Sequence, residues 1–133
     1  STTVVRLGLV SDKLKEIGNK FVNGDNDSST YSQYLESLEH LSIQAEAIHL
    51  DQKSLISNTN MLSMLQNQAG IRLLTCVVQA SLARNESRGL HKRTDFLEKD
   101  QELLHHITVD KEGNTGTLAL RKSETGNWVL TPQ

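Results

Sequence analysis

The chain has 133 residues and a formal net charge of −2, with 14 Lys and Arg against 16 Asp and Glu. This length corresponds to one domain, in which folding removes about two thirds of the unfolded surface from water. The basic residues form no stripe and no apolar run approaches the roughly 20 residues of a membrane-crossing helix, which argues against nucleic-acid binding and direct membrane insertion.

Residues 7–21 predict a first amphipathic helix, because apolar residues recur there at spacings of three and four. They are Leu7, Val10, Leu14, Ile17 and Phe21. Asn23 and Gly24 predict a left-handed C-terminal stop, and residues 24–29 a polar turn.

A second helix is predicted from about Thr30, whose hydroxyl can cap the helix while the Gln33 side chain bonds back to Thr30. Its apolar stripe is Tyr34, Leu38, Leu41, Ala45 and Ile48. Two antiparallel helices cannot bury both stripes without a third partner.

The third helix is predicted from Asn58, as N-cap, to about Asn85. Between Ala69 and Ala83 its apolar residues fall on nearly every face, which indicates burial on more than one side. Two short helices can cover one side, so the other should face a larger body. Met61 and Met64 are interpreted as core filling.

After residue 95 the pattern predicts a short helix over residues 96–106 and brief strands over residues 107–109, 117–121 and 128–130. The predicted fold is therefore mainly α: an antiparallel, spectrin-like three-helix bundle over residues 1–106, ending in the short helix. A small β hairpin or ribbon in a strand-rich tail over residues 107–133 should pack on the same single domain.

Metal binding is not predicted. His105 and His106 are neighbours, and His40 and His49 are nine residues apart, so neither pair has a ligand spacing on a helix. The single cysteine, Cys76, lies in an apolar stretch and is interpreted as a small buried hydrophobe in a reducing compartment.

A charge-dense run, Arg84 to Asp95, directly follows the apolar third helix. An enzymatic interpretation makes Ser87 a nucleophile and His91 its base, but a Gly-x-Ser-x-Gly pattern is absent. In the favoured structural interpretation, Glu86 and Arg88 make charge-assisted bonds to backbone and to a neighbouring domain, and Gly89 takes a conformation that other residues avoid.

Residues 83–95 meet every fixed position of Ala-Arg-x-Glu-Ser-Arg-Gly-x-His-x-Arg-x-Asp. This pattern resembles a motif near the C-terminus of the flavoprotein subunits of succinate dehydrogenase and fumarate reductase, and of L-aspartate oxidase. An Asn-Thr pair before a Leu-rich helix is also similar and lies at the family's distance from the motif. The candidate interface or structural residues are therefore Asn58, Thr59, Arg84, Glu86, Ser87, Arg88, Gly89, His91, Arg93 and Asp95.

The resemblance implies the C-terminal helical domain of an FAD-dependent oxidoreductase acting on succinate, fumarate or L-aspartate. The parent protein would be the enzyme and hold FAD. This chain, which lacks Gly-x-Gly-x-x-Gly, would hold no cofactor, metal or catalytic group. The implied partners are the flavin-binding and capping domains of the same protein and an iron-sulfur subunit. The implied location is the cytoplasm, peripheral on the membrane through partner subunits. Arg88, His91 and Arg93 are expected at the contact edge.

Departures from the motif leave alternatives open. Leu90 replaces the Ala usual in the dehydrogenases and matches many aspartate oxidases, whereas Arg93-x-Asp95-Phe96 favours succinate dehydrogenase and fumarate reductase, and Leu97 replaces a Pro. The alternatives are an L-aspartate oxidase domain of NAD biosynthesis, a free-standing helical adaptor that binds a protein through the third helix, and a small hydrolase. The chain begins at Ser1 without Met, which suits a trimmed fragment.

Overall fold

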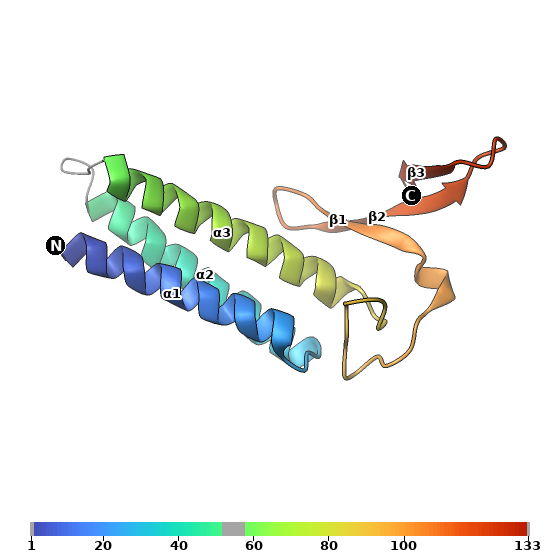
Figure 1. Cartoon of the computed structure of the whole chain (residues 1–133), viewed down its shortest axis with the longest axis horizontal. Coiled ribbons are helices and arrows are strands. Elements are labelled where there is room, and N and C mark those ends of the chain that lie inside the picture. Colours follow the sequence, from blue (N-terminus) through green and yellow to red (C-terminus); the bar gives the residue numbers. More distant parts are fainter. Residues whose placement is uncertain (1, 52–57, 133) are drawn as a thin grey trace. The chain divides into compact units, whose positions relative to one another are not determined.

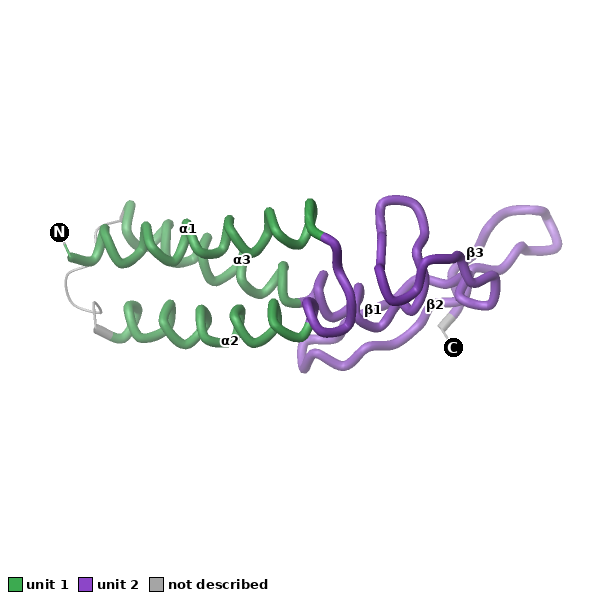
Figure 2. Tube along the Cα trace, turned by 90° about the horizontal axis from the view of Figure 1, so that it is seen from below, with its two compact units in different colours: residues 1–24, 32–75 green, residues 25–31, 76–133 purple. Residues whose placement is uncertain are grey.

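A computed structural model describes residues 2–51 and 58–132. The chain forms two compact units (Figure 2): Ser1–Gly24 with Ser32–Thr75, and Asp25–Tyr31 with Cys76–Gln133. The expected packing of a tail over residues 107–133 on a bundle over residues 1–106 stays a prediction.

Three helices form the first unit and lie side by side in it (Figure 1). They are α1 (Thr2–Asn23), α2 (Ser28–Asp51) and α3 (Asn58–Ala83), of which the last turns of α3 and the first turn of α2 belong to the second unit. The predicted bundle is therefore confirmed.

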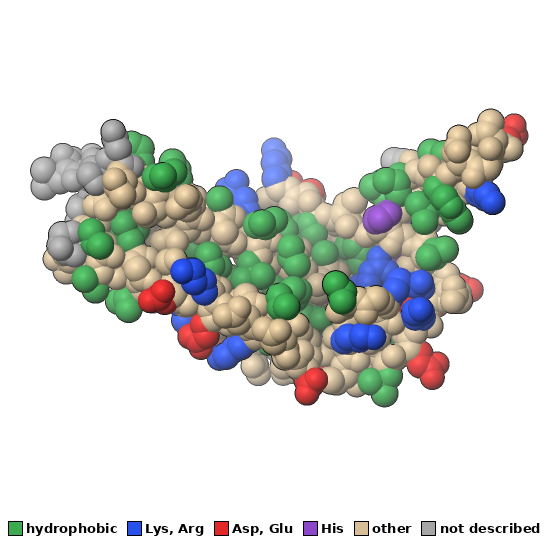
Figure 3. All heavy atoms as spheres, viewed as in Figure 1, with side chains coloured by type: hydrophobic (Ala, Val, Ile, Leu, Met, Phe, Trp, Pro, Cys, Tyr) green, Lys and Arg blue, Asp and Glu red, His purple; other side chains and the backbone are tan. Residues whose placement is uncertain are grey.

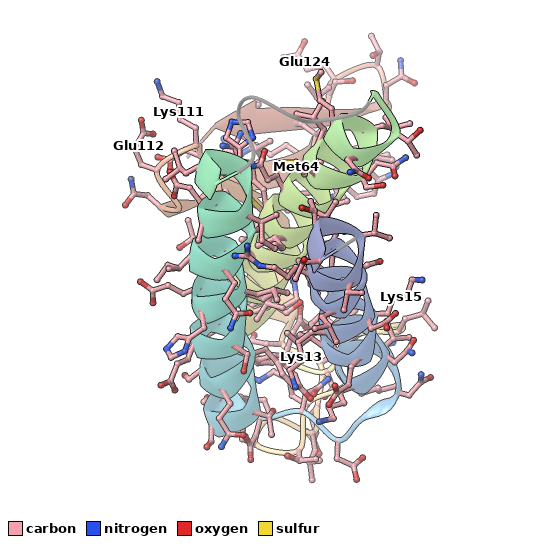
Figure 4. The ribbon with its side chains drawn as sticks, turned by 90° about the vertical axis from the view of Figure 1, so that its left-hand side faces the viewer. Lys13, Lys15, Met64, Lys111, Glu112 and Glu124 are labelled. Atoms are coloured by element: carbon pink, nitrogen blue, oxygen red, sulfur yellow. The ribbon has the colours of Figure 1, made fainter. Side chains whose placement is uncertain are left out.

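Apolar side chains at helical spacing fill the space between these helices. The buried ones in this unit are Leu7, Val10, Ile17, Leu38, Leu41, Ala45, Ile48, Met64 and Ile71. Met64 of α3 lies between the helices, while Lys15 extends from the outer side of α1 (Figure 4). Met61 is exposed, so its assignment to the core is wrong, and Cys76 is half-buried.

Contacts between α1 and α3 fix the directions of the helices. The Asn67 side-chain amide donates to the Leu7 carbonyl at 3.2 Å. Further along both helices, a Cβ placed on Gly18 would lie 4.0 Å from Leu74 Cδ2. Residue numbers increase in the same direction along α1 and α3 from the first contact to the second, so these two helices are parallel. α2, joined to α1 by a short turn, is antiparallel to both.

The turn after α1 differs from the prediction. The described residues with positive φ are all glycines, and Gly24 is not among them. Its N–H instead bonds back to the Lys20 carbonyl at 2.9 Å, and a Cβ at this position would lie 2.5 Å from that oxygen. Gly24 is thus suited to this turn by its lack of a side chain and not by a left-handed conformation.

The start of α2 also differs. The helix begins at Ser28, two residues before the predicted cap, because Asp27 and Thr30 bond reciprocally. The Thr30 N–H donates to Asp27 Oδ1 at 2.8 Å, and the Asp27 N–H donates to Thr30 Oγ1 at 2.8 Å. This is a capping box with Asp27 as the cap and Thr30 inside the first turn. The predicted capping role of Asn58 in α3 lies outside the described side chains.

The chain ends in a three-stranded antiparallel sheet of order β1-β2-β3, which confirms the predicted ribbon. Its strands are β1 (His105–Val109), β2 (Thr115–Lys122) and β3 (Trp128–Pro132), with Ile107 opposite Thr117 and Leu120 opposite Leu130. Gly113 and Gly126 have φ of 89° and 84° in the two connecting turns, where a left-handed residue is needed.

The segment predicted as a helix over residues 96–106 contains a single 3-10 turn, Gln101–Leu103. Its backbone bonds are used elsewhere: the Glu98 carbonyl accepts from Ser87, and the Asp100 N–H donates to Glu86. These tertiary bonds override the local preference for helix.

Candidate structural joint at the charged motif

The charged motif forms a loop directly after α3. We call residues 84–100 the motif loop; it belongs to the second compact unit, together with the Asp25–Tyr31 segment at the start of α2. The structure brings together the candidates Arg84, Glu86, Ser87, Arg88, Gly89, His91, Arg93 and Asp95. Asn58 and Thr59 are instead the first residues of α3, in the other unit.

Glu86 is the centre of one half of the motif loop, and none of its surface is exposed. Both of its carboxylate oxygens accept from Arg88 Nε at 3.0 Å, and one also accepts from Arg84. The Asp100 N–H donates to the same carboxylate at 2.9 Å. The two arginines in turn bond to backbone carbonyls, Arg84 to Leu103 and His105, and Arg88 to Asp100. Glu86 thereby fastens the start of the loop to its end.

These bonds decide the charge state of Glu86. Burial alone would raise its pKa, because it disfavours the charged form. The bonds from Arg88, from the Asp100 N–H and from Arg84 outweigh burial and lower the pKa of Glu86 to about 2. The carboxylate is therefore ionised at neutral pH and is not positioned to exchange a proton with a substrate.

Arg93 is the centre of the other half, and its side chain is fully buried. Its guanidinium donates to the Leu82 carbonyl at 2.9 Å and to the Arg84 carbonyl at 3.0 Å. It also lies 5.4 Å above the Tyr31 ring and 4.7 Å above the Phe96 ring. A cation over the last carbonyls of a helix satisfies groups that the helix itself leaves unpaired. Arg93 therefore caps the C-terminus of α3.

Asp95 connects Arg93 to α2. Its carboxylate accepts from Arg93 at 2.7 and 2.8 Å. It also accepts from the backbone N–H of Ser28 at 3.0 Å and from the Ser28 hydroxyl at 2.7 Å. The bond from Arg93 is the main cause that holds the pKa of Asp95 below its usual range. Since Ser28 is the first residue of α2, this carboxylate stabilises the start of α2 while its partner caps the end of α3.

Ser87 and His91 do not form a nucleophile and base. The Ser87 hydroxyl accepts from the Arg93 N–H at 2.8 Å and lies 2.6 Å from the Phe96 carbonyl. His91 Nε2 bonds to the Arg84 carbonyl at 3.3 Å, and its ring stacks on Tyr31. A hydroxyl occupied by backbone groups lacks the positioned base that nucleophilic catalysis requires.

His91 is held as a neutral side chain. Burial lowers its pKa, the bond to the Arg84 carbonyl opposes this, and the nearby Arg93 and Arg84 guanidiniums lower it further. The ring nitrogen that contacts the Arg84 carbonyl must then carry the proton and donate.

A tight turn stands at the tip of the motif loop. Arg88 and His91 exchange backbone bonds at 2.8 and 3.0 Å. Gly89 has φ of 59°, as predicted for a residue in a conformation that others avoid, and Leu90 next to it is fully exposed.

The bonds of the motif loop therefore serve to join chain segments. Within residues 2–51 and 58–132, no three His, Cys, Asp or Glu side chains lie together in a way that could hold a metal ion. The Glu86 and Asp95 carboxylates are ionised and paired with arginines, and the Ser87 hydroxyl is bonded to backbone groups.

Sequence reasoning missed the residues that the start of α2 contributes. Tyr31 is almost fully buried beneath Arg93 and His91, although the predicted stripe began at Tyr34, which is half-buried. Its position three residues before Tyr34 extends the same helical stripe, so this signal was present in the sequence. Ser28 gave no comparable signal, because it lies in a polar stretch resembling any turn.

Residues 12–133 match the family model described as "Fumarate reductase flavoprotein C-term". The chain belongs to this family. Similarity to individual members is modest but covers most of the chain. A fumarate reductase flavoprotein subunit of Mycobacterium tuberculosis is 32% identical over 93 residues, which are 69% of this chain and 16% of the relative.

Subunits of the same name give similar values in other bacteria. That of Helicobacter pylori is 26% identical over 70% of this chain and 13% of its own length. That of Escherichia coli is 27% identical over 74% of this chain and 17% of its own length. The fumarate reductase flavoprotein C-terminal region represented here thus spans less than a fifth of these relatives. No solved structure matches the chain.

Proposed function

We propose that this chain is the non-catalytic C-terminal helical domain of an FAD-dependent oxidoreductase of the succinate dehydrogenase and fumarate reductase type, and that it braces the flavin-binding domain. The observation that carries the proposal is the family match over residues 12–133 to the C-terminal region of a flavoprotein. The parent protein would hold FAD, act on a dicarboxylate and pass electrons to or from an iron-sulfur subunit. The flavin-binding and capping domains of the same polypeptide would be the direct partners.

The bonding of the motif loop supports a bracing role. Glu86 and Arg93 are both buried and fully engaged with residues of their own unit. Networks of this kind fix one arrangement of the backbone when every member is satisfied. A joint that holds two helix ends and a loop in one geometry suits a domain that must present a defined surface.

Exposure supports two of the three residues that we propose for the contact edge. Arg88 keeps 29% of its side chain exposed and His91 is half-buried, so both remain able to reach a neighbouring domain. Arg93 would act through the loop that it holds and not by direct contact, because its side chain is fully buried.

Two other functions remain as alternatives. Leu90, the residue that many L-aspartate oxidases show in this motif, favours a domain of that enzyme in NAD biosynthesis. Exposed leucines on α3 favour a free-standing adaptor that binds another protein.

Within the described part of the chain, none of the helices combines the length and apolar character needed to cross a bilayer. We place the parent protein in the cytoplasm, peripheral on the membrane through partner subunits.

The test is deletion of residues 12–133 from the complete polypeptide that the gene encodes. The temperature at which flavin is released should fall, and adding the purified 133-residue chain should restore part of the loss. Unchanged flavin release in the truncated protein would refute the bracing role. A gene that encodes this chain alone would favour the adaptor.

A further inference from the structure

The first unit leaves one side of α3 uncovered. Leu62, Leu65 and Leu73 have 57%, 56% and 67% of their surface exposed, and Ala69 between them is exposed as well. Their spacings of three, four and four residues place all four on one side of a helix. We call these four residues the leucine face. Hydrophobic side chains stand along α3 at the surface in Figure 3.

The leucine face is distinct from the side of α3 that packs in the bundle. Met64 and Ile71 are buried apolar residues, and Asn67 is buried and bonds to α1. At 100° per residue these three point away from the leucine face. α3 is therefore apolar on two opposite sides, and the bundle covers one of them.

Charge sets α3 apart from the other two helices. α1 carries six charged side chains in 22 residues and α2 four in 24, whereas α3 carries one, Arg72, in 26. The solvent side of a surface helix is normally charged or polar. The outward side of α3 has the composition of a covered surface.

The size of the leucine face indicates what covers it. The leucine face extends along roughly eleven residues of α3, or about 17 Å, and a helix is about 10 Å wide. Its area is therefore on the order of 200 Å². A stable dimer of separate chains buries about 800 Å² on each partner. A tethered partner needs far less area, because the linking chain raises its effective concentration.

We infer that the leucine face docks on the remainder of the same polypeptide, against an uncharged apolar surface of the flavin-bearing part. This inference rests on the proposed function and deepens it by naming the surface. The relatives supply the candidate occupant, since more than four fifths of their length lies outside the region matched here.

Thiol labelling tests the leucine face directly. Leu65→Cys and Leu73→Cys are made separately with Cys76→Ser, both in the 133-residue chain and in the complete flavin-loaded polypeptide. Gln44→Cys, at an exposed polar position of α2, is the matched control. A maleimide probe should label Cys at positions 65 and 73 about tenfold or more slowly in the complete polypeptide, the factor for roughly 1.4 kcal/mol of docking. The control should react equally in both.

Three results would overturn the inference. Equal labelling of positions 65 and 73 in both proteins, together with flavin loss on deletion of residues 12–133, would mean that bracing holds and another face docks. Equal labelling without flavin loss would remove the proposed function as well. Protection in the 133-residue chain itself, with dimers by light scattering that Leu65→Asp abolishes, would assign the leucine face to a second copy.

Discussion

Replacing Glu86 with Gln keeps the shape of the side chain and removes the one carboxylate that Arg84 and Arg88 share. Removal of one partner from a buried ion pair typically costs about 3–5 kcal/mol. Arg84 and Arg88 retain 18% and 29% side-chain exposure, so water can solvate part of the uncompensated charge. We therefore expect Glu86→Gln to lower the free energy of unfolding by about 2–3 kcal/mol at neutral pH.

Urea denaturation of the 133-residue chain, followed by circular dichroism, measures this loss. Glu16→Gln is the matched control, because Glu16 pairs with Lys13 and Lys20 at the surface and its loss should cost far less stability than the loss of Glu86. The folded pKa of Glu86, about 2, lies below its ordinary value of 4.5, so its contribution is full above about pH 4.5 and disappears as pH falls towards 2. Equal losses in the two variants at neutral pH would mean that the buried pairs of Glu86 add no more stability than a surface pair. A loss for Glu86→Gln that stays constant down to pH 2 would mean that the charge of Glu86 is not its cause.

Three further substitutions test separate features by the same measurement. Gly89→Ala forces a side chain into a left-handed turn and should lower the free energy of unfolding by about 1 kcal/mol. Gly8→Ala, at an open site in α1, should instead raise it by up to about 1 kcal/mol. Equal effects of the two substitutions would mean that the left-handed conformation of Gly89 carries no cost for alanine. Asp27→Ala removes the cap of α2 and should cost about 1 kcal/mol; no loss would mean that the capping box contributes nothing. Asp95→Asn should lower the free energy of unfolding at neutral pH and lower it much less in acid. The pKa of Asp95 is lowered in the folded state, so the stability that its charge contributes is lost as pH falls. A loss that does not depend on pH would mean that the charge of Asp95 does not stabilise the fold.

Helical periodicity predicted the bundle well because its cause is local. Leu38, Leu41 and Ile48 recur at the spacing of one helix face, and each is buried. The capping of α2 was placed at Thr30 instead of Asp27 because both residues have suitable side chains and the sequence does not rank them.

The motif loop was recognisable as a unit, yet its bonds were not predictable. Arg93 was expected at a contact edge, but it reaches Leu82, Ser28 and Asp95 across up to 65 residues of sequence. Such partners depend on how α2 and the end of α3 meet, which no local pattern encodes. The helix predicted over residues 96–106 does not form for the same reason, since backbone groups of this segment bond to Glu86 and Ser87.

We propose that this chain supports a flavin site without containing one. The decisive experiment is equilibrium dialysis of the purified 133-residue chain against FAD, followed by an assay of fumarate reduction with a chemical electron donor. We predict no retained flavin and no turnover above the rate without protein. Flavin bound in equal molar amount, together with reduction of fumarate by the chain alone, would mean that the chain is itself a flavoenzyme.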